Sequence, residues 1–258
     1  MKTYVCVLLM AGVGLLPGAR LAGQTETAGV HAWDGGIRQT VDGIFIPAVT
    51  GAPFTAKVAV EITHALPDGT TVSQKYYTLV ARDSQGRVHR EKRSLVPADS
   101  DREPLLMETY LMDTPERTRT ICEFVRRTCS ISSDHPASGA FVEPEGVSRD
   151  GKSYMFRENL GTSTMDDLDV QETRETRTYN AGTFGNDRPV AVTKEFWYSP
   201  QLKINLAVTR NDPRTGEQRL QVTELSLSEP DPSWFVPPQE FKVVDLRAVQ
   251  ASEASQAK

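Results

Sequence analysis

The sequence predicts an all-β protein with one minor helical turn, built as a single curved antiparallel sheet or unclosed β-barrel of about eleven strands. Three observations carry this prediction. Apolar and polar residues alternate along many short segments, which is typical of strands with one buried face. Turn-forming residues separate these segments at short intervals. A good helix start signal occurs once, and the helix that it would begin is short.

The first two strands have the clearest pattern. In residues 54–62 every second position is apolar, so this segment is predicted to be a half-buried strand. A Pro-Asp-Gly turn follows at 67–69, and residues 70–82 are rich in the strand formers Thr, Val and Tyr. Residues 24–50 mix Gly, Thr and short apolar stretches, and we expect them to be a flexible entry segment.

Residues 82–93 (RDSQGRVHREKR) contain five Arg or Lys residues. Asp83 and Gly86 suit the first and fourth positions of a type I turn, so we interpret the stretch as a hairpin tip followed by a strand over 87–93. Both faces of that strand are polar, which predicts a solvated or edge strand. A contact with an anionic surface is the alternative, but the stretch has acidic residues and lacks an aromatic residue that could stack on a base.

Further strand–turn–strand units follow, interrupted mainly by a loop-like stretch over residues 135–152. Short connections make sequential antiparallel pairing the default arrangement. These later strands are predicted at 105–113, 117–124, 160–164, 170–179, 190–198, 202–210, 218–227 and 241–246.

The helical turn is predicted at Asp231-Pro232, because Asp can cap a helix and Pro suits its first turn. A Pro-Pro pair at 237–238 ends it. The turn carries Trp234 and Phe235, which we expect to dock into the sheet and cap its cavity. Replacing Trp234 with alanine should then cost about 3–5 kcal/mol of stability, as for a large buried aromatic residue.

The N-terminus resembles a cleavable signal peptide, with Lys2, an apolar run over 4–16 and small residues at 21–23. The apolar run is shorter than the roughly 20 residues of a membrane-spanning helix. Gln24 stands where a lipoprotein would have its acylated Cys. The protein is therefore expected to be periplasmic or extracellular, with no transmembrane segment in the mature chain.

These features predict four regions along the chain. Residues 1–23 form the signal peptide, 24–50 the flexible segment, 51–247 the antiparallel β domain and 248–258 a disordered tail. Removing the signal peptide leaves 27 basic and 34 acidic residues, a net charge of −7. A chain this acidic is a poor candidate for nucleic-acid binding.

Two cysteines, Cys122 and Cys129, remain after Cys6 leaves with the signal peptide. Either they form a local disulfide, which an exported protein permits, or they are two partly buried free thiols. A metal site is disfavoured, because structural zinc wants about four convergent Cys or His ligands. The histidines, at positions 31, 64, 89 and 135, lie elsewhere.

Catalysis lacks support in the sequence. The chain has no nucleophile elbow, no zinc-protease motif and no phosphate-binding glycine loop. His135 beside Asp134 could titrate usefully, but such a pair in a loop is far more often incidental. We therefore predict a protein that is not an enzyme, with no cofactor and no metal.

Aromatic residues concentrate at two places, and four of them are the candidate ligand-binding residues: Phe196, Trp197, Trp234 and Phe235. One interpretation is a core residue with an aromatic plug over it. The other is an apolar ligand pocket, because such sites are mainly hydrophobic with a few polar groups.

Several segments resemble a group of uncharacterised bacterial secreted proteins, namely Tyr77–Glu91, Gly185–Pro189, Trp197–Pro200, Asp212–Gly216 and Glu229–Pro232. More distantly, the strand-rich second half with its short aromatic turn resembles the lipoprotein-carrier superfamily. That resemblance implies a strongly curved antiparallel sheet, an unclosed barrel that covers an apolar cavity. The chain departs from this pattern in its polar strands and its scarcity of helices.

We expect an exported, non-enzymatic envelope protein that binds an apolar or amphiphilic ligand, such as a lipid, on the concave face of the sheet. The alternative is a protein-interaction or sensor module, in which exposed edge strands pair with an envelope protein partner.

Overall fold

The computed structural model describes residues 43–134 and 143–248. The predicted signal peptide, residues 24–42 of the entry segment, His135 and residues 249–258 of the tail lie outside this part of the chain. Within it, no helix has the length and apolar character needed to cross a bilayer. The same residues contain no group of three or more His, Cys, Asp or Glu side chains placed to hold a metal ion.

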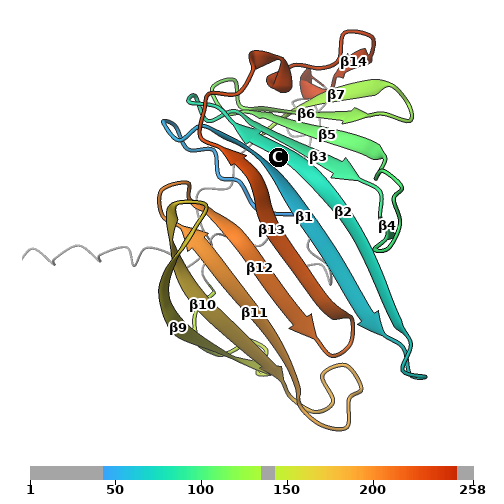
Figure 1. The fold of residues 1–258 in the computed structure, drawn as a ribbon, viewed down its shortest axis with the longest axis vertical. Coiled ribbons are helices and arrows are strands. Elements are labelled where there is room, and N and C mark those ends of the chain that lie inside the picture. The colour runs from blue at the N-terminus through green and yellow to red at the C-terminus, as the bar shows by residue number, and fades with distance from the viewer. Residues whose placement is uncertain (1–42, 135–142, 249–258) are drawn as a thin grey trace, which may run out of the picture.

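All the strands in residues 43–134 and 143–248 belong to one sheet (Figure 1). The predicted all-β class and unclosed sheet are confirmed, with 14 strands in this described part of the chain in place of about eleven. The strands are β1 (Phe54–Ala65), β2 (Thr71–Arg82), β3 (Val88–Arg93), β4 (Val96–Pro97), β5 (Leu106–Asp113), β6 (Thr118–Glu123), β7 (Thr128–Ser133), β8 (Gly146–Val147), β9 (Ser153–Met165), β10 (Leu168–Tyr179), β11 (Val190–Ser199), β12 (Ile204–Asp212), β13 (Gly216–Ser226) and β14 (Lys242–Asp245).

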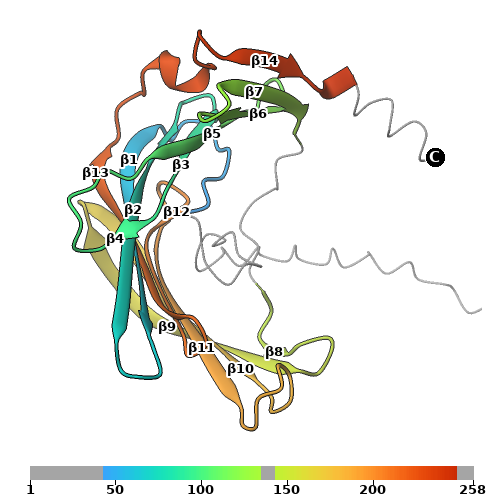
Figure 2. The ribbon, with the colours of Figure 1, turned by 90° about the vertical axis from the view of Figure 1, so that its right-hand side faces the viewer.

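The strand order is β14-β7-β6-β5-β3-β2-β1-β13-β12-β11-β10-β9-β8, with the short β4 paired to β2. Neighbours along the chain mostly pair as antiparallel hairpins, as predicted, whereas β14 runs parallel to β7. The first and last halves of the chain meet where β1 pairs with β13. The sheet bends into an open C, with β14 and β8 at its two edges (Figure 2).

The two faces of this sheet differ in character. The segment 43–53 lies on the concave side (Figure 2), and we term this side the inner face. Ile44 and Ile46 pack there against alternate residues of β1, including Val58, and against Leu206 and Leu220 of β12 and β13. Burial of this continuous apolar surface is the main source of stability. Residues on the opposite, convex side form the outer face.

The strand over 87–93 is not at an edge, so that prediction is wrong. β3 lies between β2 and β5, and Glu91 is only 8% exposed. The predicted turn before it is correct: the Gly86 N–H donates to the Asp83 carbonyl oxygen at 3.0 Å. On the outer face of β3, His89, Glu91 and Arg93 make specific contacts, whereas Lys92 on the other face is 46% exposed.

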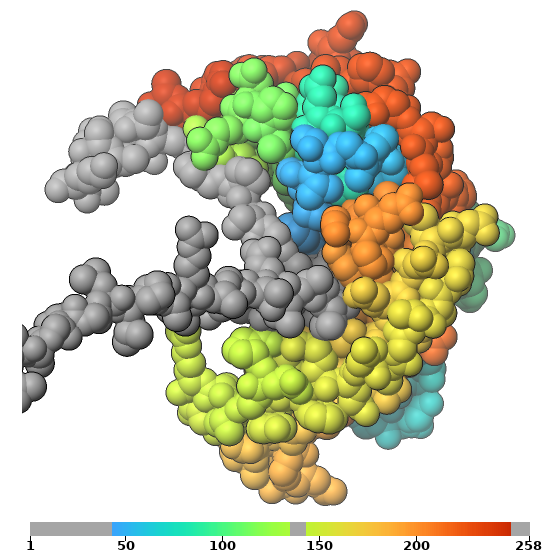
Figure 3. Space-filling view, turned by 90° about the vertical axis from the view of Figure 1, so that its left-hand side faces the viewer, coloured from blue at the N-terminus to red at the C-terminus, as the bar shows by residue number. Residues whose placement is uncertain are grey.

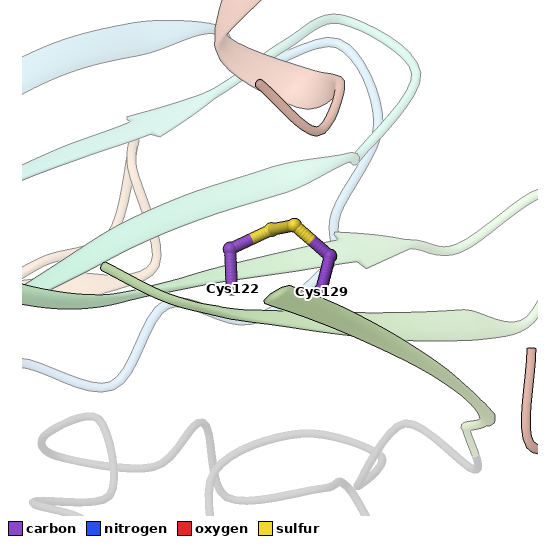
Figure 4. The surroundings of a disulfide bond; sticks show 2 residues. All are labelled: Cys122 and Cys129. Carbon is purple, nitrogen blue, oxygen red and sulfur yellow. A yellow bond between two sulfur atoms is a disulfide. The ribbon is translucent and has the colours of Figure 1, made fainter. Parts of the chain in front are cut away.

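The two remaining cysteines lie opposite each other on β6 and β7. The structure joins Cys122 and Cys129 in a disulfide (Figure 4). Both residues are buried, and they form a small second core with Phe124 and Phe241. The rings of Phe124 and Phe241 meet edge to face at 5.0 Å. This cluster ties the segment around Phe241 to the β6–β7 hairpin.

Candidate ligand-binding site

The aromatic turn near the C-terminus forms as the sequence predicts. It is a single 3-10 turn, η1 (Pro232–Phe235), with Pro232 at its start. The Asp231 carboxylate accepts the Ser233 backbone N–H at 2.8 Å. This hydrogen bond holds the pKa of Asp231 below its usual value. A capped start and two following prolines therefore fix where the two aromatic residues lie.

The turn docks on the outer face of β3 and β5. The Nδ1 atom of His89 lies 2.7 Å from the Trp234 carbonyl oxygen, and the two rings meet edge to face at 5.0 Å. Phe235 is 9% exposed, and its ring packs under the Arg87 guanidinium at 4.9 Å. The plug therefore sits on the convex side of the sheet, opposite the face on which we expected it to cap a cavity.

A cleft of about 390 Å³ opens between this turn and the strands beneath it. We term it the apolar cleft, because aliphatic and aromatic side chains dominate its walls. Its volume falls in the range of about 300–1,000 Å³ that is usual for small-molecule sites. It is lined by Leu79, His89, Glu91, Leu106, Thr109, Leu111, Phe124, Ser233, Trp234, Val236, Pro237, Pro238 and Gln239.

The walls of the apolar cleft also contain a few polar groups. His89 faces a carbonyl oxygen through Nδ1, so Nδ1 carries the proton and Nε2 can accept a hydrogen bond. Burial lowers the pKa of His89, which keeps the ring neutral at pH 7. The Glu91 carboxylate accepts hydrogen bonds from Arg93 Nε at 2.7 Å and from the Leu79 N–H at 3.3 Å. The cleft can therefore hold an apolar group and orient it through hydrogen-bond acceptors.

The buried histidine predicts a dependence of stability on pH. Because burial lowers the pKa of His89 in the folded protein, the unfolded chain binds a proton more readily. The contribution of neutral His89 to the free energy of unfolding is complete above the pKa of the unfolded chain, about 6.5. This contribution is lost as the pH falls toward the lower pKa of the folded protein. Urea unfolding between pH 8 and pH 5 should show less of this loss for His89→Gln than for the wild type. If the wild type and His89→Gln lose stability in parallel, His89 is not the cause.

A second hollow of about 650 Å³ lies on the same face, over β1, β2 and β13. The loop 98–104 forms its rim. We term it the charged groove, because ionisable side chains supply most of its lining. Its basic residues are Lys57, Lys75, Arg102 and Arg219, and its acidic residues are Glu61, Asp101 and Glu103.

The four predicted ligand-binding residues do not form one site. Phe196 is 1% exposed and belongs to the core, and Trp197 packs partly buried against that core. Trp234 lines the apolar cleft, whereas Phe235 packs beside Arg87. The strands β2, β1, β13 and β12 separate β11 from β3, which keeps the two aromatic pairs apart. Trp234 is only half-buried, so the cost expected for truncating a buried aromatic residue applies to Phe235 instead.

Sequence reasoning missed most of the cleft. Leu79, Leu106, Leu111 and Phe124 come from two strands, β2 and β5, and the turn after β6, and their own segments show only ordinary strand patterns. One signal was present, because His89 and Glu91 share a face of a strand with little other apolar content. The turn around Trp234 covers this face. The contact is long-range, because His89 and Trp234 lie 145 positions apart along the chain.

No family model matches the chain, and no curated protein matches its sequence. Many solved structures resemble it in part, and three of them illustrate the range. The Pseudomonas aeruginosa MucA/MucB complex matches at 13% identity over 75% of this chain and 58% of that chain, with a TM-score of 0.37. Mycobacterium tuberculosis lipoprotein LppX matches at 12% over 70% and 90%, with a TM-score of 0.28.

A DUF1329 family protein from Desulfovibrio piger matches at 8% identity over 72% of this chain and 90% of that chain, with a TM-score of 0.22. The chain spans less than two thirds of the MucB-containing chain that it matches. These are partial likenesses of the chain to solved structures, each with a TM-score below 0.5.

Proposed function

We propose that the protein is an exported, non-enzymatic binding protein that holds an apolar or amphiphilic ligand in the apolar cleft. The observation that carries this proposal is the cleft itself, a hollow of about 390 Å³ with leucine, proline and aromatic walls. Covering apolar ligand surface there gains about 25 cal/mol per Å². The acceptor atoms of His89 and Glu91 would fix the orientation of the ligand.

The polar groups of the cleft favour binding over catalysis. His89 is committed through Nδ1 to the Trp234 carbonyl oxygen, and Glu91 is committed to Arg93. A nucleophile with its own base would need a hydrogen-bonded pair aimed at a common point. Here each ionisable side chain instead supports the wall of the cleft.

We place the ligand on the outer face in preference to the concave face that the sequence suggested. On the inner face, Val58, Leu206 and Leu220 are at most 1% exposed and pack against Ile44 and Ile46. On the outer face, Leu79 and Leu106 are only partly buried and border the cleft. The concave face is the competing location that the experiments below separate from this one.

Filling the cleft should weaken binding. A dansyl-labelled undecanoic acid should bind the wild type with a saturable rise in fluorescence, and Leu106→Trp should weaken that binding about tenfold or more, a loss of at least about 1.4 kcal/mol. Leu160→Trp is the matched control, because Leu160 lies 40% exposed on β9, away from the cleft. Equal affinity of both variants would show that the probe binds elsewhere.

A second candidate function, pairing with a partner strand, has one observation in its favour. β14 ends the sheet, and Val243 and Val244 are 46% and 38% exposed there. The N–H groups of Lys242 and Leu246 donate to the carbonyl oxygens of Arg127, just before β7, and Ile131 in β7. By the alternation of the ladder, Val243 directs its N–H to the free edge. Val243→Pro should remove this donor and spare the fold. An envelope protein that the wild type captures and the variant retains would exclude strand addition at this edge.

A further inference from the structure

The apolar cleft and the charged groove are neighbours on the outer face. Tyr77 lines the groove and Leu79 lines the cleft, and both belong to β2. Residues two apart on a strand point to the same face and lie about 7 Å apart. The lining also changes from groove to cleft between the loop before β5 and β5 itself, since Pro104 lines the groove and Leu106 lines the cleft.

Arg93 marks the boundary between the two hollows. Its Nε donates to Glu91 of the cleft at 2.7 Å, and its Nη1 donates to the Pro104 carbonyl oxygen of the groove at 3.1 Å. The guanidinium lies 4.5 Å from the ring centre of Tyr77 and 3.5 Å from Glu103. These contacts fix the position of the Arg93 side chain. The surface is apolar on one side of Arg93 and polar on the other.

The charges of the groove are close to balance. Lys57 pairs with Glu224 at 3.2 Å, and Arg219 pairs with Glu217 at 2.5 Å. Glu61 and Lys75 are direct partners in the pairing of β1 with β2. A strongly charged group would therefore meet like charges as well as opposite ones. Hydroxyl groups, which both donate and accept, suit a lining of this kind.

We propose that the ligand is an amphiphile with an uncharged polyhydroxyl headgroup, whose chain fills the apolar cleft and whose headgroup lies in the charged groove across Arg93. This inference rests on the proposed function and extends it. Arg93 acts as the specificity-determining residue, because it sets how far the headgroup lies from the buried chain. The groove has a volume of about 650 Å³, which is larger than the cleft and leaves room for a bulky headgroup.

The test compares four amphiphiles with the same dodecyl chain, each below its micelle concentration, as competitors for the dansyl-labelled undecanoic acid. Their headgroups are maltoside, plain alcohol, sulfate and trimethylammonium. Dodecyl maltoside should displace the probe at about tenfold lower concentration than the other three. Equal displacement by all four, or tightest binding of a charged one, would overturn the headgroup assignment and leave the proposed function standing. If the probe does not bind and none of the four amphiphiles displaces it, the headgroup assignment and the proposed function are both contradicted.

A groove variant makes the result specific. Arg102 is exposed on the rim of the groove, so Arg102→Ala should fold normally. It should reduce the preference for maltoside over alcohol by about threefold or more and leave the affinity for dodecanol unchanged. Arg188→Ala is the matched control, since Arg188 is 83% exposed in a different loop. An unchanged preference in Arg102→Ala, or an equal reduction in the control, would contradict a headgroup site in the groove.

Discussion

Replacing Gly216 with alanine should destabilise the protein by about 3–4 kcal/mol. Gly216 begins β13 with a φ of +89°, a conformation that costs an L-residue about 1–2 kcal/mol. A Cβ atom there would also lie 2.0 Å from the Thr63 carbonyl oxygen of β1. Because that neighbour is backbone, it can only yield by moving the strand, at the seam where the two halves of the chain pair.

Gly182→Ala separates the two causes. Gly182 has a similar φ of +83°, but open space surrounds its Cβ position. Urea unfolding should therefore give a loss of about 1–2 kcal/mol for this variant, well below that of Gly216→Ala. If both variants lose the same stability, the close approach of β1 to the β12–β13 turn has no energetic weight.

Removing the Arg82 guanidinium should cost about 3–5 kcal/mol. Arg82 is 0% exposed and donates to three backbone carbonyl oxygens, those of Ala52, Pro47 and Leu202. Burial lowers its pKa to about 10, so it remains charged at neutral pH. In Arg82→Met the chain length is kept but the three acceptors are left without donors, and an unsatisfied buried acceptor costs about 1–3 kcal/mol.

Arg82 connects three parts of the chain, so removing its guanidinium should disturb the structure as well as lower the stability. It joins the segment 43–53 to the end of β2 and to the turn between β11 and β12. Figure 3 shows this segment, in blue, lying between the teal part of the chain and the orange turn near residue 200. Amide exchange at Ile44 and Ile46 should accelerate in Arg82→Met. Lys92→Met is the control, because Lys92 is 46% exposed and should change stability by at most about 0.5 kcal/mol. Slow exchange in Arg82→Met would contradict this role.

The fold could be predicted where burial follows a local pattern. The alternation over 54–62 predicted β1 from its first residue, because one face of that strand packs in the core. β7 was missed, since its sequence TCSISS offers few β-branched or aromatic residues and is held by pairing and the disulfide. The strands β4 and β8 have two residues each, too few to leave a periodic signal.

The candidate site could be predicted only in part. The turn that carries Trp234 has a local signal, a capping Asp before a Pro, and it formed as expected. The burial of Glu91 and Arg93 has no local signal, because the groups that cover and pair them arrive from other parts of the chain. A strand with two polar faces therefore suggested an edge, although Glu91 and Arg93 are paired with each other on the outer face of an interior strand.

Methyl NMR with laurate tests the central claim most directly, since it reports which face of the sheet the chain touches. With leucine methyl groups labelled, laurate should shift the resonances of Leu79, Leu106 and Leu111, which line the apolar cleft. The methyl groups of Leu206 and Leu220, buried on the inner face, should stay unchanged. Shifts confined to those two inner-face residues, or no saturable shift at all, would contradict a binding site on the convex side.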